Sequence, residues 1–379
     1  MADAGGLLVV VANFDEDGGL QRMYRRRSTA LAADRPVTVL TWGRPHAAVD
    51  GLQDVPVVRV PSLVSWNRDH AGPLAAANTA FSVATGLRAA LRLRRRWRRV
   101  HAAGLNPEGV VAALAARALA RPYSLGAWLP GELGNVARLE RSRLRRLLVR
   151  LLAAADAYLA ENVEIERELV AAGFPSSRVH VVPAGVSLDR FLPANEQRRR
   201  AERRRLGFDG SRLVVSCVRF DLRQKRPDLL LEAWRLARLD GWRLVLVGDG
   251  PDRNRLEAIA DGIEPRPSFV GWQRDIRPFL AAADLFVFPT NFEGTGLALM
   301  EALACGLPAV VSARPPFARL RPEGAFLAPN DPRSWADALI HLTSDEHARR
   351  ALAAGARSWV EQRYDERRSD DAVRSLLST

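Results

Sequence analysis

The sequence of 379 residues has little of several features, and each shortage excludes a class of protein. It holds two cysteines, Cys217 and Cys305, which lack the paired spacing of a zinc knuckle or a disulfide framework. Its start lacks a basic region followed by an apolar core, so no secretory signal peptide is expected. Its longest uncharged run, residues 71–87, contains proline, asparagine and glycine and is a poor membrane span. We therefore expect a cytoplasmic protein with a reduced interior.

Lysine is also nearly absent, because Lys225 is the one lysine among 56 Lys and Arg residues. The formal net charge is +13, and residues 86–150 carry most of the excess, with 15 arginines against Glu108, Glu132 and Glu140. No aromatic or groove-reading motif accompanies this charge, so nucleic acid is not an expected partner. No cluster of His, Asp or Glu has the spacing of metal ligands, so no required metal is expected either.

The chain is longer than a usual single domain, and its pattern predicts two. Short β-rich runs alternate with helical stretches, which is typical of parallel sheets, and the charged segment 193–210 separates two such series. We predict an α/β protein with two Rossmann-like, doubly wound domains, residues 1–192 and 193–355. A C-terminal helix within 356–379 is expected to pack back towards the first domain. Parallel sheets bind ligands beyond their carboxyl ends, so the expected site is a central cleft between two facing edges.

The stretch richest in signals is a strand at 285–289 followed by a glycine loop and a helix. Gly294 and Gly296 would let the backbone approach a bulky anion, towards which the first helical amides direct free N–H groups. Glu293 and Glu301 supply two carboxylates that could reach two sets of hydroxyl groups. Taken alone, a helix-capping acid and an ordinary helix glutamate would explain the two residues better.

The surrounding residues favour the functional interpretation. Residues 293–308 read EGTGLALMEALACGLP, which resembles the donor signature of the retaining family-four glycosyltransferases, the bacterial glycosyl transferases of group 1. That signature has two glutamates, with seven residues between them, in a Gly-Leu, Glu-Ala and Cys-Gly-Leu-Pro frame. Weaker likenesses at 181–187, 246–251 and 269–272, the last a base-side loop, extend the resemblance over residues 150–375.

The resemblance implies a GT-B fold and a nucleotide diphosphate sugar as donor, with no separate cofactor. By that resemblance Glu293 contacts the donor sugar and Glu301 holds the ribose. The residues that it assigns to the diphosphate lie in the glycine loop and first helical turn: Gly294, Thr295, Gly296 and Leu297.

Two cations follow a predicted strand at 213–217. Arg219 is the second residue after it, and Lys225 precedes a helix predicted at 226–239. A leaving nucleoside diphosphate gains negative charge, which a fixed guanidinium and an ammonium could neutralise without a metal. The pair matches the Arg and Lys of the family, although Arg226 stands where the family usually has glycine. Surface charge is the alternative for most arginines here, but it explains a single retained lysine poorly.

The first domain offers weaker candidates. The turn at Gly19, after the first strand, resembles the family's Gly-Gly turn, which would bring backbone amides to the diphosphate. The alternative is a plain loop in which residues 15–17 cap the next helix. Residues 127–135 lack the histidine of many relatives but resemble a Gly-Glu variant, in which Glu132 could touch hydroxyl groups as readily as form an ordinary loop. Trp128 could form a sugar-contacting wall or pack in the core. His101 is a ligand candidate or a buried hydrogen-bonding residue.

The Arg-rich segment 86–150 includes the runs 87–99 and 138–152, where leucines recur at helical spacing beside arginines. A basic helix with a core-facing leucine stripe is one interpretation. The other is attachment to an anionic membrane surface at the inner membrane face, which would suit a lipid-linked acceptor.

The resemblance implies transfer of a hexose-type sugar from a UDP- or GDP-sugar to a hydroxyl acceptor, with retention at the anomeric carbon. The acceptor is a glycan, a lipid-linked sugar or a natural product, and the residues do not select among them. A nucleotide-sugar epimerase and a donor-binding protein without transfer activity are the alternatives.

Overall fold

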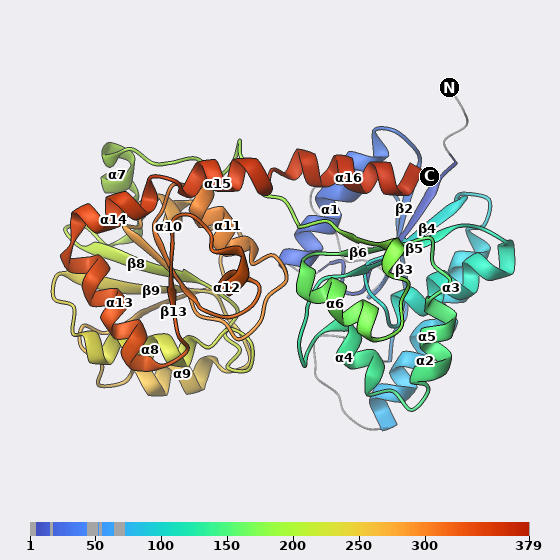
Figure 1. Ribbon diagram of the computed structural model, residues 1–379, viewed down its shortest axis with the longest axis horizontal. Helices are drawn as coiled ribbons and strands as arrows, with labels where there is room; N and C mark the ends of the chain where they lie inside the picture. Colours follow the sequence, from blue (N-terminus) through green and yellow to red (C-terminus); the bar gives the residue numbers. More distant parts are fainter. Residues whose placement is uncertain (1–4, 16–17, 44–51, 53–54, 64–72, 379) are drawn as a thin grey trace. The chain divides into compact units, whose positions relative to one another are not determined.

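The computed structural model describes residues 5–15, 18–43, 52, 55–63 and 73–378, and Figure 1 shows the course of the chain. Its contacts divide it into a first unit, Met1–Ala184 with Arg367–Thr379, and a second unit, Gly185–Glu366. The division falls at Ala184 and Gly185, whereas the sequence placed a boundary near residue 192. The segment 356–379 is itself divided, because its last helix belongs to the first unit from Arg367 onward.

The first unit contains a seven-stranded parallel sheet in the order β3-β2-β1-β4-β5-β6-β7. Its central strands are short apolar runs buried on both faces, as parallel sheets require. The strands are β1 (Leu7–Val10), β2 (Val37–Trp42), β3 (Val57–Val60), β4 (Arg99–Ala102), β5 (Tyr123–Ala127), β6 (Ala157–Ala160) and β7 (Val179–Val181).

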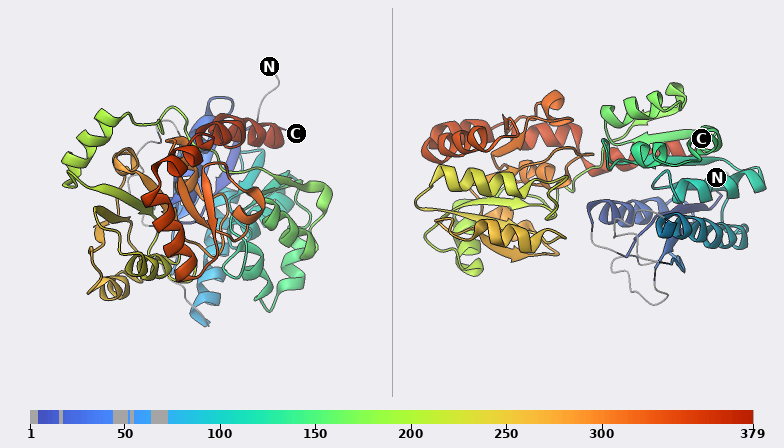
Figure 2. Two further views of the ribbon diagram at one scale, coloured as in Figure 1. Left: turned by 60° about the vertical axis from the view of Figure 1, so that its left-hand side comes forward. Right: turned by 90° about the horizontal axis from the view of Figure 1, so that it is seen from below.

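Helices cover both faces of this sheet (Figure 2). They are α1 (Gly19–Ala32), α2 (Pro73–Arg92), α3 (Glu108–Leu119), α4 (Asn135–Glu140), α5 (Arg145–Leu152), α6 (Val163–Ala171) and α16 (Glu366–Ser378), with a 3-10 turn at Ser176–Arg178. α16 lies along α1, where buried Arg27 pairs with Asp370 at 3.5 Å and donates to Ser369 Oγ.

The second unit contains a six-stranded parallel sheet in the order β10-β9-β8-β11-β12-β13. The strands are β8 (Arg212–Cys217), β9 (Trp242–Val247), β10 (Ser268–Gly271), β11 (Leu285–Phe288), β12 (Ala309–Ser312) and β13 (Ala325–Ala328). The strand order reverses between β8 and β11, and in open α/β sheets such a reversal marks where ligands bind.

The helices of the second unit again lie on both faces of its sheet (Figure 2), with α8 against α13 and α7 against α10. They are α7 (Glu196–Leu206), α8 (Pro227–Ala237), α9 (Arg253–Ala260), α10 (Arg277–Ala282), α11 (Leu297–Ala304), α12 (Phe317–Leu320), α13 (Pro332–Ser344), α14 (Glu346–Ala353) and α15 (Ala356–Arg363).

These two α/β units confirm the predicted fold class, while several predicted elements were wrong in detail. The helix expected through 87–99 stops at Arg92, because Trp97 turns into the core and donates from Nε1 to Ala90 O. The helix expected through 138–152 breaks between α4 and α5, where Ser142 Oγ accepts from Leu144 N. Residues expected to form a base-side loop form β10 instead, and β13 was not predicted.

None of the helices among the described residues is both long enough and apolar enough to cross a bilayer.

Candidate functional site

The functional candidates of the second unit gather at the carboxyl edge of its sheet. β8 ends at Cys217, two residues before Arg219, and the adjacent strand β11 ends at Phe288, five residues before Glu293. Because β8 and β11 are hydrogen-bonded neighbours at the strand-order reversal, the loops after them emerge side by side.

The centre of this edge is an ion pair between the Lys225 ammonium and Glu293 Oε1. Both side chains are shielded from solvent, with 16% of Lys225 and 6% of Glu293 exposed. Thr290 supports the pair, because its hydroxyl lies 3.0 Å from the same Oε1 and can donate to it. The sequence assigned Lys225 to a phosphate and Glu293 to a sugar; the structure brings the two side chains into direct contact.

Lys225 is held by its turn as well as by its partner. Its amide donates to Asp221 O at 2.9 Å, and its ammonium lies 5.0 Å from the centre of the Phe288 ring. The next residue, Arg226, is left-handed with a φ of 46°, and α8 then begins at Pro227. This conformation explains why glycine suits the position after the lysine in the family pattern.

After β11 the chain forms a glycine loop and then a helix, in the order that the sequence predicted. Gly296 has a φ of 73° and ends the loop, and α11 starts at Leu297. A Cβ at Gly296 would lie 2.7 Å from Phe317 Cζ, so no other residue fits without rearrangement. The amides of Leu299 and Met300 donate to Gly296 O, so the amides of Leu297 and Ala298 open α11 directly after the glycine loop.

The remaining donor candidates lie in or beside this helix. Thr295 and Glu301 are 4% and 8% exposed, so neither is an ordinary surface residue. Leu297 is half-buried in the first turn. Glu301 is one turn further into α11, and its charge contributes to raising the pKa of buried Cys305 to about 12, after burial itself.

Arg219 is exposed, but its backbone is fixed by the neighbouring loop. Phe220 N donates to Asp249 O at 3.0 Å, and Val218 N donates to Val247 O at 3.1 Å. Gly248 makes this approach possible, because a Cβ there would lie 1.9 Å from Val218 O. The motif at 246–251 thus serves to hold the strand end that carries Arg219.

In the first unit, Gly19 is the first residue of α1, and Gly18 before it is extended. Gly18 O accepts from Arg22 N at 3.0 Å, and none of the side chains that the structure describes caps the helix. Asp15, one of the residues considered as a cap, instead pairs with Arg59 at 2.7 Å. Residues 16 and 17 lie outside the described residues.

The loop after β5 presents Trp128 and Glu132. Trp128 is half-buried and Glu132 is exposed. Asn135 Oδ1 accepts from the amides of Trp128 and Leu129, at 3.0 and 3.3 Å, and Glu168 Oε1 accepts from Gly131 N at 2.7 Å. Side chains on two different helices therefore fix the shape of this loop.

His101 lies inside the first unit and is 1% exposed. Its Nε2 lies 3.1 Å from Tyr24 Oη and its Nδ1 lies 2.9 Å from Ser124 Oγ, so both ring nitrogens already have protein partners. Burial, followed by the charge of Arg27, lowers the pKa of His101 to about 3. These contacts fit the buried hydrogen-bonding residue rather than the ligand.

Sequence reasoning missed the residues that position the candidates: Thr290, Asn135 and Glu168. Thr290 had a signal, since it is the first hydroxyl after the buried strand β11. Asn135 also had one, because it opens α4, but Glu168 sits 37 positions from the amide that it accepts from. Burial raises the pKa of Glu168, and only the folded chain brings it to Gly131.

Two family profiles match the chain, one over most of each unit. A glycosyl transferase 4-like domain matches residues 18–185, and the profile described as glycosyl transferases group 1 matches residues 211–345. The chain belongs to the group 1 glycosyltransferase family. Curated members of this family include the D-inositol 3-phosphate glycosyltransferase of Xylanimonas cellulosilytica, 36% identical over 55% of the chain and 53% of that protein.

Another similar member is the GDP-mannose-dependent monoacylated alpha-(1-6)-phosphatidylinositol monomannoside mannosyltransferase of Corynebacterium glutamicum. It is 30% identical over 48% of this chain and 51% of its own length. The chain therefore spans about half the length of the curated relatives that it matches.

Solved structures of glycosyltransferases share the fold over nearly the whole chain. Anabaena HepE in complex with UDP and glucose has a TM-score of 0.80 at 20% identity and covers 98% of this chain and 99% of its own. WaaG, a glycosyltransferase involved in lipopolysaccharide biosynthesis, has a TM-score of 0.75 at 20% identity. The match covers 98% of this chain and 99% of WaaG. These similarities establish the GT-B fold of this family member.

Proposed function

We propose that the protein transfers a hexose-type sugar from a UDP- or GDP-sugar to a hydroxyl acceptor, with retention at the anomeric carbon. The observation that carries the proposal is the shielded Lys225–Glu293 pair at the strand-order reversal, followed along the chain by the glycine loop and α11. In this proposal the second unit binds the donor and the first unit supplies the acceptor side.

The chemistry asks for positive charge where the diphosphate leaves. As the glycosidic bond breaks, the nucleoside diphosphate gains negative charge, and Arg219, Lys225 and the amides of α11 are proposed to neutralise it. The departing phosphate oxygen would take the proton of the acceptor hydroxyl as it attacks from the same face. Glu293 would bind sugar hydroxyl groups and Glu301 the ribose, so the reaction would require no metal.

The relatives support the type of donor. HepE has been crystallised with UDP and with UDP-glucose, and the Corynebacterium relative is described as GDP-mannose-dependent. The name of the Corynebacterium relative also includes a phosphatidylinositol compound, and another relative is named for lipopolysaccharide core biosynthesis. Acceptors with glycan or lipid parts are therefore the first to test.

Release of nucleoside diphosphate from a panel of UDP- and GDP-sugars, with and without acceptors, tests the proposal. We expect acceptor-dependent release that Lys225→Ala lowers by about 10²-fold or more, the usual effect of losing one transition-state donor. Lys225→Arg, which keeps the charge, should lose less. An altered sugar without any acceptor would indicate an epimerase, and donor binding without release would indicate a binding protein.

The stereochemistry has its own test. Proton NMR of the first product formed from an α-linked donor should show an α-linkage, since retention preserves the anomeric configuration. A β-linked first product would exclude the same-face mechanism while leaving the transferase activity standing.

We further propose that the first unit binds the inner membrane face through α5 and the turn before it. Leu144 and Leu147 are 60% and 63% exposed, although apolar. The arginines around them are exposed too: Arg141, Arg143, Arg145, Arg146 and Arg150. A surface that combines exposed leucines with arginines suits an anionic bilayer, where apolar burial and charge attraction add.

Flotation with vesicles containing phosphatidylglycerol tests this surface. Leu144→Ser with Leu147→Ser should weaken co-flotation at least about tenfold, because burying each leucine contributes about 1.5 kcal/mol or more. A matched control is Leu192→Ser with Leu236→Ser, which removes two exposed leucines of the second unit. Equal flotation of the native protein and both variants would eliminate the membrane proposal.

A further inference from the structure

Besides α5 and the turn before it, the first unit has a second basic tract, Arg94-Arg95-Arg96-Trp97-Arg98-Arg99. It lies at the edge of the sheet where the strands begin. The tract connects α2 to β4 and is anchored at its centre. Trp97 is fully buried, donates from Nε1 to Ala90 O at 3.0 Å, and has the Arg121 guanidinium 4.7 Å from its ring centre. Arg98 N also donates to Gly6 O at 2.7 Å. The backbone that carries these arginines is therefore well fixed.

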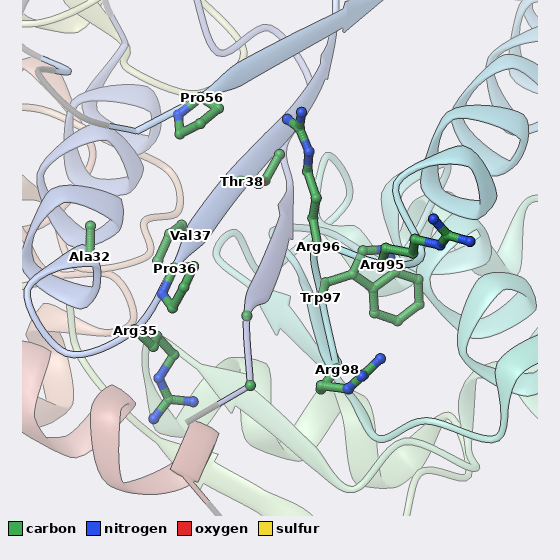
Figure 3. Close-up of a pocket in the computed structure, with 12 residues that line it drawn as sticks. Ala32, Arg35, Pro36, Val37, Thr38, Pro56, Arg95, Arg96, Trp97 and Arg98 are labelled. Atoms are coloured by element: carbon green, nitrogen blue, oxygen red, sulfur yellow. The ribbon is translucent and has the colours of Figure 1, made fainter. Parts of the chain in front are cut away.

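Beside this tract is a cavity of about 620 Å³. It opens where four parallel strands begin, between the residues that lead into β1, β2, β3 and β4. Its lining includes Gly5, Gly6, Pro36 and Val37 with four arginines, Arg35, Arg95, Arg96 and Arg98, and none of the described residues that line it is acidic. In Figure 3, Arg96 runs along Thr38, while Arg95 and Arg98 extend to the right, on the side away from Arg35.

The arginines of the cavity differ in how they are held. Arg35 donates from Nη1 to Leu377 O at 2.9 Å and from Nη2 to Ser378 Oγ at 2.7 Å. Among the described residues, no side-chain hydrogen bond or ion pair engages Arg95, Arg96 or Arg98, and all three are exposed. Three guanidinium groups on a fixed backbone are thus available to an incoming ligand.

The arginines at this edge lie close enough together to lower one another's pKa. Burial lowers the pKa of Arg121, and Arg98 lowers it further. Burial also lowers the pKa of Arg99, an effect that Asp156 opposes and Arg35 reinforces. Positive groups that destabilise one another in this way would be stabilised by an anion.

We propose that this cavity, at the amino edge of the first sheet, is a binding site for a phosphate-bearing ligand. Guanidinium groups form paired hydrogen bonds with phosphate oxygens, and the volume suits a small molecule or a headgroup rather than a single ion. The phosphate could belong to a soluble phosphorylated compound or to an anionic phospholipid. The site lies at the strand ends opposite those near Gly19 and Trp128, and the proposal does not depend on the transferase activity.

The test replaces Arg95, Arg96 and Arg98 together with glutamine and leaves Trp97 intact, so the anchored turn is kept. The control replaces Arg200, Arg204 and Arg205 with glutamine, because these exposed arginines of α7 carry the same charge in the second unit. The full-length proteins are titrated calorimetrically with inorganic pyrophosphate, in saturating UDP to occupy the proposed donor site. Circular dichroism confirms that each is folded. A second arm measures binding to vesicles with and without phosphatidic acid.

We expect the cavity variant, and not the control, to lose at least about tenfold in affinity for one of the two probes. Loss with pyrophosphate identifies a soluble ligand, and loss confined to phosphatidic acid vesicles identifies a lipid headgroup. α5 is unchanged in all three proteins, so a loss specific to the cavity variant cannot come from that helix. If the cavity variant binds both probes as well as the control does, the site does not exist.

Discussion

Removing the charge of Lys225 alone, and then the charges of Lys225 and Glu293 together, should separate the structural from the chemical role of the pair. Glu293 is only 6% exposed, so Lys225→Met leaves a shielded carboxylate without its cation. Breaking a buried pair on one side costs about 3 to 5 kcal/mol, and the 16% exposure of Lys225 places this variant near 3. Lys225→Met with Glu293→Gln removes both charges, and Thr290 can still donate to the new amide oxygen. The double variant should therefore lose only about 1 kcal/mol.

Equilibrium unfolding in urea, with the transition of the second unit fitted separately, measures these differences. The exposed pair Arg235–Glu232 on α8 is the control, and its coupling should stay below about 0.5 kcal/mol. Nucleoside diphosphate release should be about 10²-fold lower than that of the native protein in both Lys225→Met and the double variant. The reasoning fails if the double variant is no more stable than Lys225→Met, or if activity returns together with stability.

Three further outcomes are expected. His101 has a pKa of about 3 when folded against 6.5 in a model peptide, so the unfolded chain binds a proton first as pH falls. The free energy of unfolding should thus drop by about 1.4 kcal/mol per pH unit below pH 6.5, and His101→Asn should flatten that slope; equal slopes in urea titrations would contradict the buried neutral imidazole. Gly296→Ala, which forces a Cβ against Phe317, should destabilise the second unit by about 2 kcal/mol in thermal unfolding, and an unchanged midpoint would show that the loop is not strained. Chelation with EDTA should leave product formation within about twofold of its untreated rate, since the proposed cations are side chains; loss restored by a divalent ion would show a metal requirement.

The sequence predicted the central strands well because they are apolar runs buried on both faces. β6 and β12 have the bounds that their apolar runs indicate, and so does the half-buried edge strand β3. The errors lie where a side chain ends a helix: Trp97 donates to Ala90 O, and Ser142 Oγ accepts from Leu144 N. Hydrophobic periodicity reveals neither bond.

The local structure around the candidate site was predictable where its residues follow one another in the chain. Gly296 and the start of α11 have the predicted geometry because a glycine loop before a helix is a local pattern. The contact between Lys225 and Glu293 was not predictable, since 68 positions separate them and only the pairing of β8 with β11 brings them together.

The arginine cavity shows the same limit. A run of arginines in a chain so rich in arginine is typical of a solvated surface. Its distinct character comes from the buried Trp97 and from strand starts that are far apart in sequence.

The most direct measurement of the central claim is a crystal structure of the protein with UDP or GDP. The account predicts the diphosphate within hydrogen-bonding distance of the backbone amides of Gly296 and Leu297, with the Arg219 and Lys225 side chains turned towards it. A well-ordered nucleotide bound elsewhere on the protein, with these amides and cations untouched, would contradict it.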